Sequence, residues 1–65
     1  MIFVRLEPKG QEIQVHKAST VLQLLRQLGY GPNSVLVIRN NELLTPDRQL
    51  KAGDEIIVRG VSSRG

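Results

Sequence analysis

The stretch Thr20-Val21-Leu22-Gln23-Leu24-Leu25-Arg26-Gln27-Leu28-Gly29 decides how this chain folds, because it carries every signal of one short helix. Thr20, with Gln23 three residues later, makes a capping box in which the two side chains satisfy unpaired backbone N–H groups. An apolar stripe at helical spacing follows, formed by Val21, Leu24, Leu25 and Leu28. Gly29 is typical of a helix end, since it adopts a left-handed conformation without strain. So short a helix needs a sheet to pack against.

The residues before the helix predict a β-hairpin. Apolar residues at positions 2, 4 and 6 alternate with Phe3, Arg5 and Glu7, which is the period of a half-buried strand. The segment Pro8-Lys9-Gly10 has the residues of a tight turn. Apolar residues at positions 13 and 15 then repeat the alternation, so two adjacent strands joined by this turn are expected.

The residues after the helix predict three more strands. Residues 35–38, Val-Leu-Val-Ile, form a continuous apolar run, which favours a central strand covered over much of both faces. Asn40-Asn41 predicts a turn, and residues 42–44 leave room for only a short strand. Leu50 is expected to fill the core from an irregular segment. Residues 55–60 form the last strand, which could pair with another chain if it lies at a sheet edge.

This order of elements predicts an α+β domain of two layers, with one helix packed on one face of a mixed sheet. In outline the order is β-β-α-β-β, with the short strand 42–44 in addition. Sixty-five residues allow one domain. We assign residues 1–60 to that domain and residues 61–65 to a flexible C-terminal tail.

The composition argues against several kinds of site. The chain has no cysteine and a single histidine, His16, so we expect neither a disulfide nor a metal site. The formal net charge of +3 is dispersed, and two aromatic residues, Phe3 and Tyr30, offer little for stacking on bases, so no nucleic-acid partner is expected. Asp54 after Gly53 is typical of a turn. Without a nucleophile–base pair or phosphate loop, the chain is not expected to be an enzyme in its own right.

The chain also lacks an obvious membrane or export signal. No stretch approaches the ~20 apolar residues of a membrane span. The N-terminal segment MIFVRLEPKG is too short in its apolar part, and too charged, for a signal peptide. We therefore expect a soluble, cytoplasmic protein with no membrane partner.

Three stretches together resemble a known family. They are residues 20–29, quoted above, residues 35–44, Val-Leu-Val-Ile-Arg-Asn-Asn-Glu-Leu-Leu, and residues 50–58, Leu-Lys-Ala-Gly-Asp-Glu-Ile-Ile-Val. Their order and spacing resemble the β-grasp fold of ubiquitin-like proteins and, within it, the small sulfur carriers of the ThiS/MoaD type. The resemblance covers nearly the whole chain, and the short length favours the ThiS-like branch.

The resemblance implies where the chemistry lies. In that family the C-terminal carboxylate, here that of Gly65, is adenylated by a ThiF/MoeB-type enzyme that uses ATP. Sulfur then displaces AMP to leave a thiocarboxylate, which a downstream sulfur-accepting synthase uses for thiamin thiazole, molybdopterin or tRNA thiolation. The chain is then a protein cosubstrate with no bound cofactor. Ser62, Ser63 and Arg64 form the tail that threads into the partner, and a terminal glycine has no Cβ to clash there.

Arg64 departs from the family pattern, which ends in two glycines. Three interpretations stay open: the side chain clashes in the partner's channel, it pairs with the phosphates of ATP, or the natural terminus differs from this one.

Two functions other than sulfur carriage also stay open. One is a β-grasp interaction module without covalent chemistry, and the other is a ubiquitin-like modifier conjugated to lysines.

The sheet face opposite the helix is the expected docking surface for a partner. Phe3 faces outward if its apolar neighbours face inward, and Leu43 or Leu44 should be exposed, since so short a segment cannot bury both. An exposed apolar patch near arginines suits a protein partner. Arg59, in the last strand before the tail, is expected to steer an acidic partner.

Overall fold

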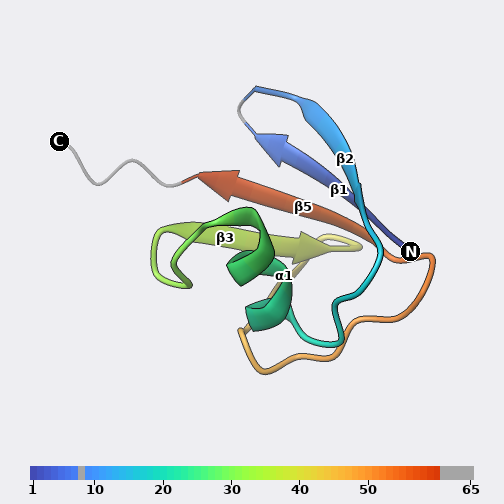
Figure 1. The fold of residues 1–65 in the computed structure, drawn as a ribbon. Helices are drawn as coiled ribbons and strands as arrows, with labels where there is room; N and C mark the ends of the chain where they lie inside the picture. Colours follow the sequence, from blue (N-terminus) through green and yellow to red (C-terminus); the bar gives the residue numbers. More distant parts are fainter. Residues whose placement is uncertain (8, 61–65) are drawn as a thin grey trace, which may run out of the picture.

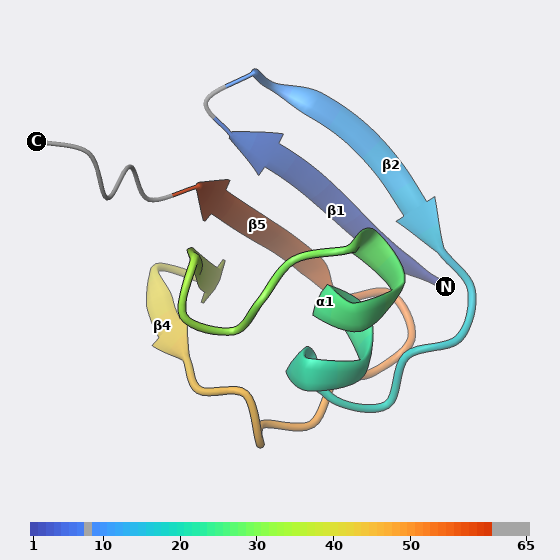
Figure 2. The same cartoon turned by 60° about the vertical axis from the view of Figure 1, so that its left-hand side comes forward.

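The computed structural model describes residues 1–7 and 9–60, which form five strands and one helix (Figure 1). In chain order these are β1 (Ile2–Glu7), β2 (Gln11–Val15), α1 (Val21–Leu28), β3 (Val35–Arg39), β4 (Glu42–Leu44) and β5 (Glu55–Gly60). The helix packs on one face of a single mixed sheet, as the two views in Figures 1 and 2 show. The predicted α+β, β-grasp class is confirmed.

The last strand lies in the middle of the sheet. The strands are ordered β2-β1-β5-β3-β4, and β5 pairs in parallel with β1 and antiparallel with β3. The condition under which β5 could pair with another chain, a place at the sheet edge, is therefore not met. The edges are β2 and the three-residue β4. A sequence pattern cannot report this order, because a strand's neighbours are set by long-range pairing.

The helix begins and ends as its sequence predicts. Thr20 Oγ1 accepts a hydrogen bond from the Gln23 backbone N–H at 3.2 Å, and the Gln23 side chain accepts one from the Ser19 N–H at 2.8 Å. Two further N–H groups of the first turn donate to the carbonyls of Pro46 and Arg48. The segment after β4 therefore supplies acceptors for N–H groups at the helix N-terminus, which have no partner within the helix. Gly29 ends the helix at φ +85°.

The core lies between the helix and the inner face of the sheet. The apolar side chains at alternate strand positions face the helix stripe, and Leu50 joins them from the irregular segment, as expected. The buried set is Ile2, Val4, Val15, Val21, Leu24, Leu25, Val35, Val37, Leu44, Leu50, Ile56 and Val58. None of the described buried side chains is polar or charged, so hydrophobic burial dominates the stability of the domain.

Two expectations about burial need correction. The run in β3 is covered on one face only, because Val35 and Val37 point into the core while Leu36 is 40% exposed. Leu44, proposed as a docking residue, is 5% exposed and belongs to the core, whereas Leu43 is 59% exposed. The pleat gives the reason: Leu44 is paired with Val37, which also points inward, and neighbours in one strand face opposite ways.

Asp54 anchors the long connection between β4 and β5. Its carboxylate accepts hydrogen bonds from the Lys51 backbone N–H at 2.8 Å and from the Arg39 guanidinium at 2.9 Å. Arg39 also donates to the Gln49 carbonyl, and the Arg39 and Asp54 side chains are each 19% exposed. The hydrogen bond from the Lys51 N–H is the main cause that lowers the pKa of Asp54, and Arg39 lowers it further. Burial acts in the opposite direction but does not cancel these two effects. Asp54 thus has the structural role in a turn that its sequence context predicts.

Replacing Asp54 with Asn should destabilise the fold in a pH-dependent way. We expect the free energy of unfolding to fall by about 1–2 kcal/mol at pH 7, because a charged acceptor for two donors is lost. The folded-state pKa is lowered, so this contribution is complete above the unfolded value of ~3.9 and disappears as the pH falls through the folded value. Urea unfolding of the variant and the unchanged chain at pH 7 and pH 3 measures the loss of unfolding free energy and its dependence on pH. Glu55→Gln, an exposed neighbour with the same charge change, is the control; an equal loss there would contradict the assignment.

The adjacent leucines of β4 give a second test of the fold. Leu44→Ala should lower the free energy of unfolding by about 2–4 kcal/mol, because it leaves a cavity in the core. Leu43→Ala should change it by less than about 0.5 kcal/mol, because that side chain is exposed. Both are measured by urea unfolding. The reverse order would show that β4 is paired one residue out of register.

Candidate functional site

The described chain ends at the root of the predicted tail. Gly65, Ser62, Ser63 and Arg64, the residues predicted for the chemistry and for threading, lie outside the described residues. Gly60, the last residue of β5, is paired with Val35 of β3. The preceding residue, Arg59, is paired with Leu36 on one side and with Glu7 on the other. Residues 61–65 thus continue from a residue held by β3, directly after one that is paired on both sides.

The outer face of the sheet carries a continuous apolar row. Ile38 of β3 is paired with Ile57 of β5 on one side and with Leu43 of β4 on the other. The three side chains share the face opposite the helix, since their inner neighbours are buried. Leu36 lies two residues from Ile38 on the same face. An apolar row thus runs across the outer face of β4, β3 and β5, with Glu55 and Arg59 on either side of Ile57 in β5.

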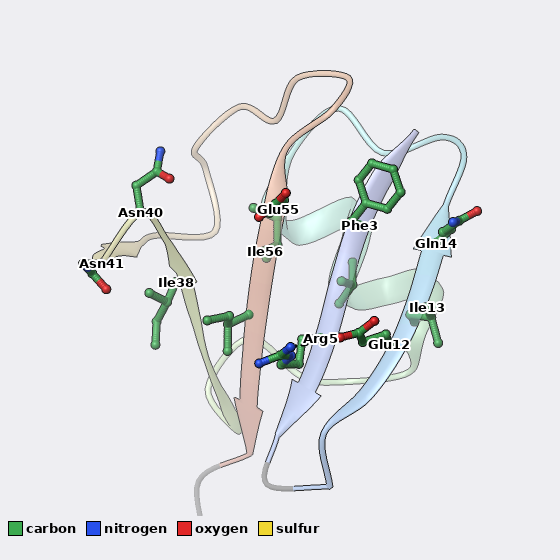
Figure 3. Close-up of a pocket in the computed structure, with 12 residues that line it drawn as sticks. Phe3, Arg5, Glu12, Ile13, Gln14, Ile38, Asn40, Asn41, Glu55 and Ile56 are labelled. Atoms are coloured by element: carbon green, nitrogen blue, oxygen red, sulfur yellow. Dashed lines mark hydrogen bonds and ion pairs between the residues drawn. The ribbon is translucent and has the colours of Figure 1, made fainter.

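A shallow groove crosses this face beside the row (Figure 3). Phe3, 42% exposed, lies at the β1 side, and Ile38 and Ile57 lie at the β3 and β5 side. Asn40 and Asn41 close one end from the turn after β3, where both adopt left-handed conformations with φ of 54° and 65°. The turn pair predicted from the sequence therefore shapes the rim of the groove.

Two ion pairs border the apolar surface. The Arg5 guanidinium contacts the Glu12 carboxylate at 2.9 Å across β1 and β2, and the hydrogen bond that Arg5 donates to Glu12 raises the pKa of Arg5. Arg59 contacts Glu7 at 3.2 Å across β5 and β1. Arg59 was predicted to steer an acidic partner. The structure places it on the expected face, and half of its side chain is exposed, but its charge is already paired with Glu7.

Neither a metal-binding cluster nor a membrane-spanning helix is found among the described residues. No group of three or more His, Cys, Asp or Glu residues within 1–7 and 9–60 is placed to hold a metal ion. His16 is exposed, beside Lys17 at the end of β2. The helix, the one described here, is too short to cross a membrane.

Sequence reasoning found Phe3 and Leu43 on this face but missed Leu36, Ile38 and Ile57. The sequence pattern contains the signal for all three. Once residues 35 and 37 of β3 are assigned to the core, strict alternation puts Leu36 and Ile38 on the other face. Ile57 follows in the same way from Ile56 and Val58. The continuous apolar runs in both strands hid the alternation, because they suit burial on two faces equally well.

The comparisons with known proteins agree with this architecture. The sequence model of the ThiS family matches residues 2–58, which span all of β1 to β4 and most of β5. The chain is also 29% identical over 58 residues to the sulfur carrier protein TtuB of Thermus thermophilus, and the match covers 89% of each chain. The family match covers the hairpin, the helix and the central strand that leads to residue 60. The chain therefore belongs to the ThiS family.

Proposed function

We propose that this chain is a sulfur carrier whose reactive group is the carboxylate of its C-terminal glycine, Gly65. The observation that carries the proposal is the match of residues 2–58 to the ThiS family, together with the likeness to a sulfur carrier over 89% of the chain. Within the described residues, no cluster of side chains suited to metal catalysis competes with this assignment.

The proposed reaction has two steps, both performed by a partner enzyme. A carboxylate oxygen of Gly65 attacks the α-phosphorus of ATP, and pyrophosphate leaves. A sulfide ion (HS⁻) then attacks the carbonyl carbon of the acyl-adenylate and loses its proton, and AMP leaves with the carboxyl oxygen. The product is a thiocarboxylate. A carboxylate is a poor acyl donor until it is adenylated, so the carrier itself needs a reachable terminus and no catalytic group.

The fold is consistent with a carrier that presents its terminus to a partner enzyme. The tail continues from Gly60, at the end of a strand paired on both sides, so the domain fixes where the tail starts. Ser62, Ser63 and Arg64 then span the distance into the partner's site. Arg64 replaces the glycine usual at that position, and we propose that its guanidinium is accommodated there by the phosphates of ATP, which match its planar set of donors.

The outer face of the sheet is the proposed docking surface for the adenylating enzyme. Phe3 and Leu43 are exposed on it, and the half-buried Ile38 and Ile57 connect the two sides. Exposed apolar surface costs free energy in water, and covering it with a partner recovers that free energy. Leu44 does not belong to this surface because it is buried.

We propose that the sulfur is passed on to one of three kinds of product: thiamin thiazole, molybdopterin or thiolated tRNA.

Mass spectrometry of the intact chain tests the proposed reaction. After incubation with the host's adenylating enzyme, ATP and a sulfur donor, the mass should rise by the difference between sulfur and oxygen. Deletion of Gly65 should abolish the gain, and Arg64→Gly shows whether the arginine is tolerated. No gain for the chain, where Arg64→Gly does react, would contradict the proposal and favour a binding module. Covalent adducts with other proteins, and no thiocarboxylate, would favour a modifier instead.

Variants of the outer face test the docking surface separately. Phe3→Ala and Leu43→Ala should each raise the KM for the carrier in the adenylation reaction by roughly five- to tenfold, the size expected for an apolar anchor, with little change in kcat. Pyrophosphate release measures both constants. Tyr30→Ala, which removes an exposed aromatic side chain in the loop between α1 and β3, is the control. Unchanged KM values for both outer-face variants would rule out this face as the docking surface.

A further inference from the structure

A second surface, away from the outer face, lies where the edge strand β2 meets the helix. A shallow groove runs between them, lined by Ile13 and Val15 of β2, His16 and Lys17 just after it, and Gln27 and Leu28 at the end of α1. Figure 2 shows β2 at the rim of the sheet with α1 beside it. The Gln27 side chain donates a hydrogen bond to the Lys17 carbonyl, which ties the strand's exit to the helix along the groove.

The strand that borders this groove is an edge open to pairing. β2 is five residues long, and in the described part of the chain its one strand neighbour is β1. Its register with β1 runs through five consecutive pairs, without a bulge. The strand Gln11–Val15 contains neither lysine nor proline, two residues that often protect sheet edges. The other edge, β4, is three residues long, and short edge strands are themselves protected.

The groove has a chemical character of its own. Ile13 and Leu28 are half-buried and give it an apolar floor. His16 and Lys17 are its ionisable residues, and no acidic residue lines it. Glu12, the acidic residue of β2, is held on the opposite face of the sheet by Arg5. An occupant should therefore bring apolar side chains for the floor and negative charge for the end near Lys17.

We propose that the β2 edge and this groove bind an extended, acidic-ended peptide segment of a partner protein, which adds to the sheet as a sixth strand. Backbone hydrogen bonds would supply binding, and alternate side chains would fill the groove. A second copy of this chain fits less well. In β2 the inward side chains Ile13 and Val15 already pack against their own core, so a copy has no free apolar side chain to insert. This inference does not depend on sulfur transfer.

Synthetic peptides test the proposal on the full chain. Two peptides alternate Thr and Val over five residues and carry two Asp residues, at the C-terminus in one and at the N-terminus in the other, to allow for parallel or antiparallel pairing. In two-dimensional NMR we expect at least one to bind with a Kd below about 1 mM. The shifted amides should be those of residues 11–17 and 27–28. A peptide with Lys in place of Asp should bind more weakly.

A pair of charge reversals makes the test specific. Lys17→Glu should weaken binding of the better peptide roughly two- to fivefold, the range of an exposed ion pair. Lys9→Glu, at the opposite end of β2 and outside the groove, makes the same change in net charge and should leave the Kd unchanged.

Three results would overturn the proposal. The first is no binding of either peptide at millimolar concentration. The second is evidence that the peptide does not bind in the groove, either an equal effect of both charge reversals or amide shifts centred on Phe3 and Ile38 of the outer face. The third is a concentration-dependent shift of residues 11–17 without peptide, which would identify a second copy of the chain as the occupant.

Discussion

The pairing of β5 between β1 and β3 is the constraint on which the rest of the structure depends. Because β5 is central, Ile56 and Val58 are buried beneath the helix, while Ile57 completes the apolar row on the opposite face. The same pairing holds Gly60, from which the tail continues. Parallel pairing with β1 joins the two ends of the chain, and such long-range contacts form only after a large loss of chain entropy.

The connection between β4 and β5 makes that central position possible. It passes the start of the helix, where the carbonyls of Pro46 and Arg48 accept hydrogen bonds from the first helical turn, and Leu50 enters the core. Asp54 then fixes the turn into β5 through the Lys51 N–H and Arg39. An irregular segment of this kind is stable because its backbone groups find partners. One carboxylate and one guanidinium therefore contribute much to positioning the strand that ends at the tail.

Much of the fold could be predicted from the sequence, because its signals are local. The capping box, the helix stripe, the Gly29 stop and the Asn40-Asn41 turn each follow from the chemistry of a few neighbouring residues, and all are present in the structure. The place of β5 and the opposite fates of Leu43 and Leu44 depend on which strand lies alongside, which no local pattern records. The outer apolar row was missed in part because the continuous apolar runs in β3 and β5 suit burial on two faces as well as on one. The proposed role of the tail rests on the family resemblance, since residues 61–65 carry no packing pattern.

In the proposed function, the domain of residues 1–60 docks on the partner enzyme and the terminal carboxylate of Gly65 reacts. The proposed reaction is tested most directly on protein from the host, by electrophoresis through a gel that contains an organomercury ligand. The chain has no cysteine, so strong retardation by mercury would have to come from sulfur at its terminus. We expect a fraction of the native chain to be retarded, and deletion of Gly65 to remove the effect. A chain that is never retarded, in cells whose sulfur-transfer pathways are active, would contradict the proposed reaction.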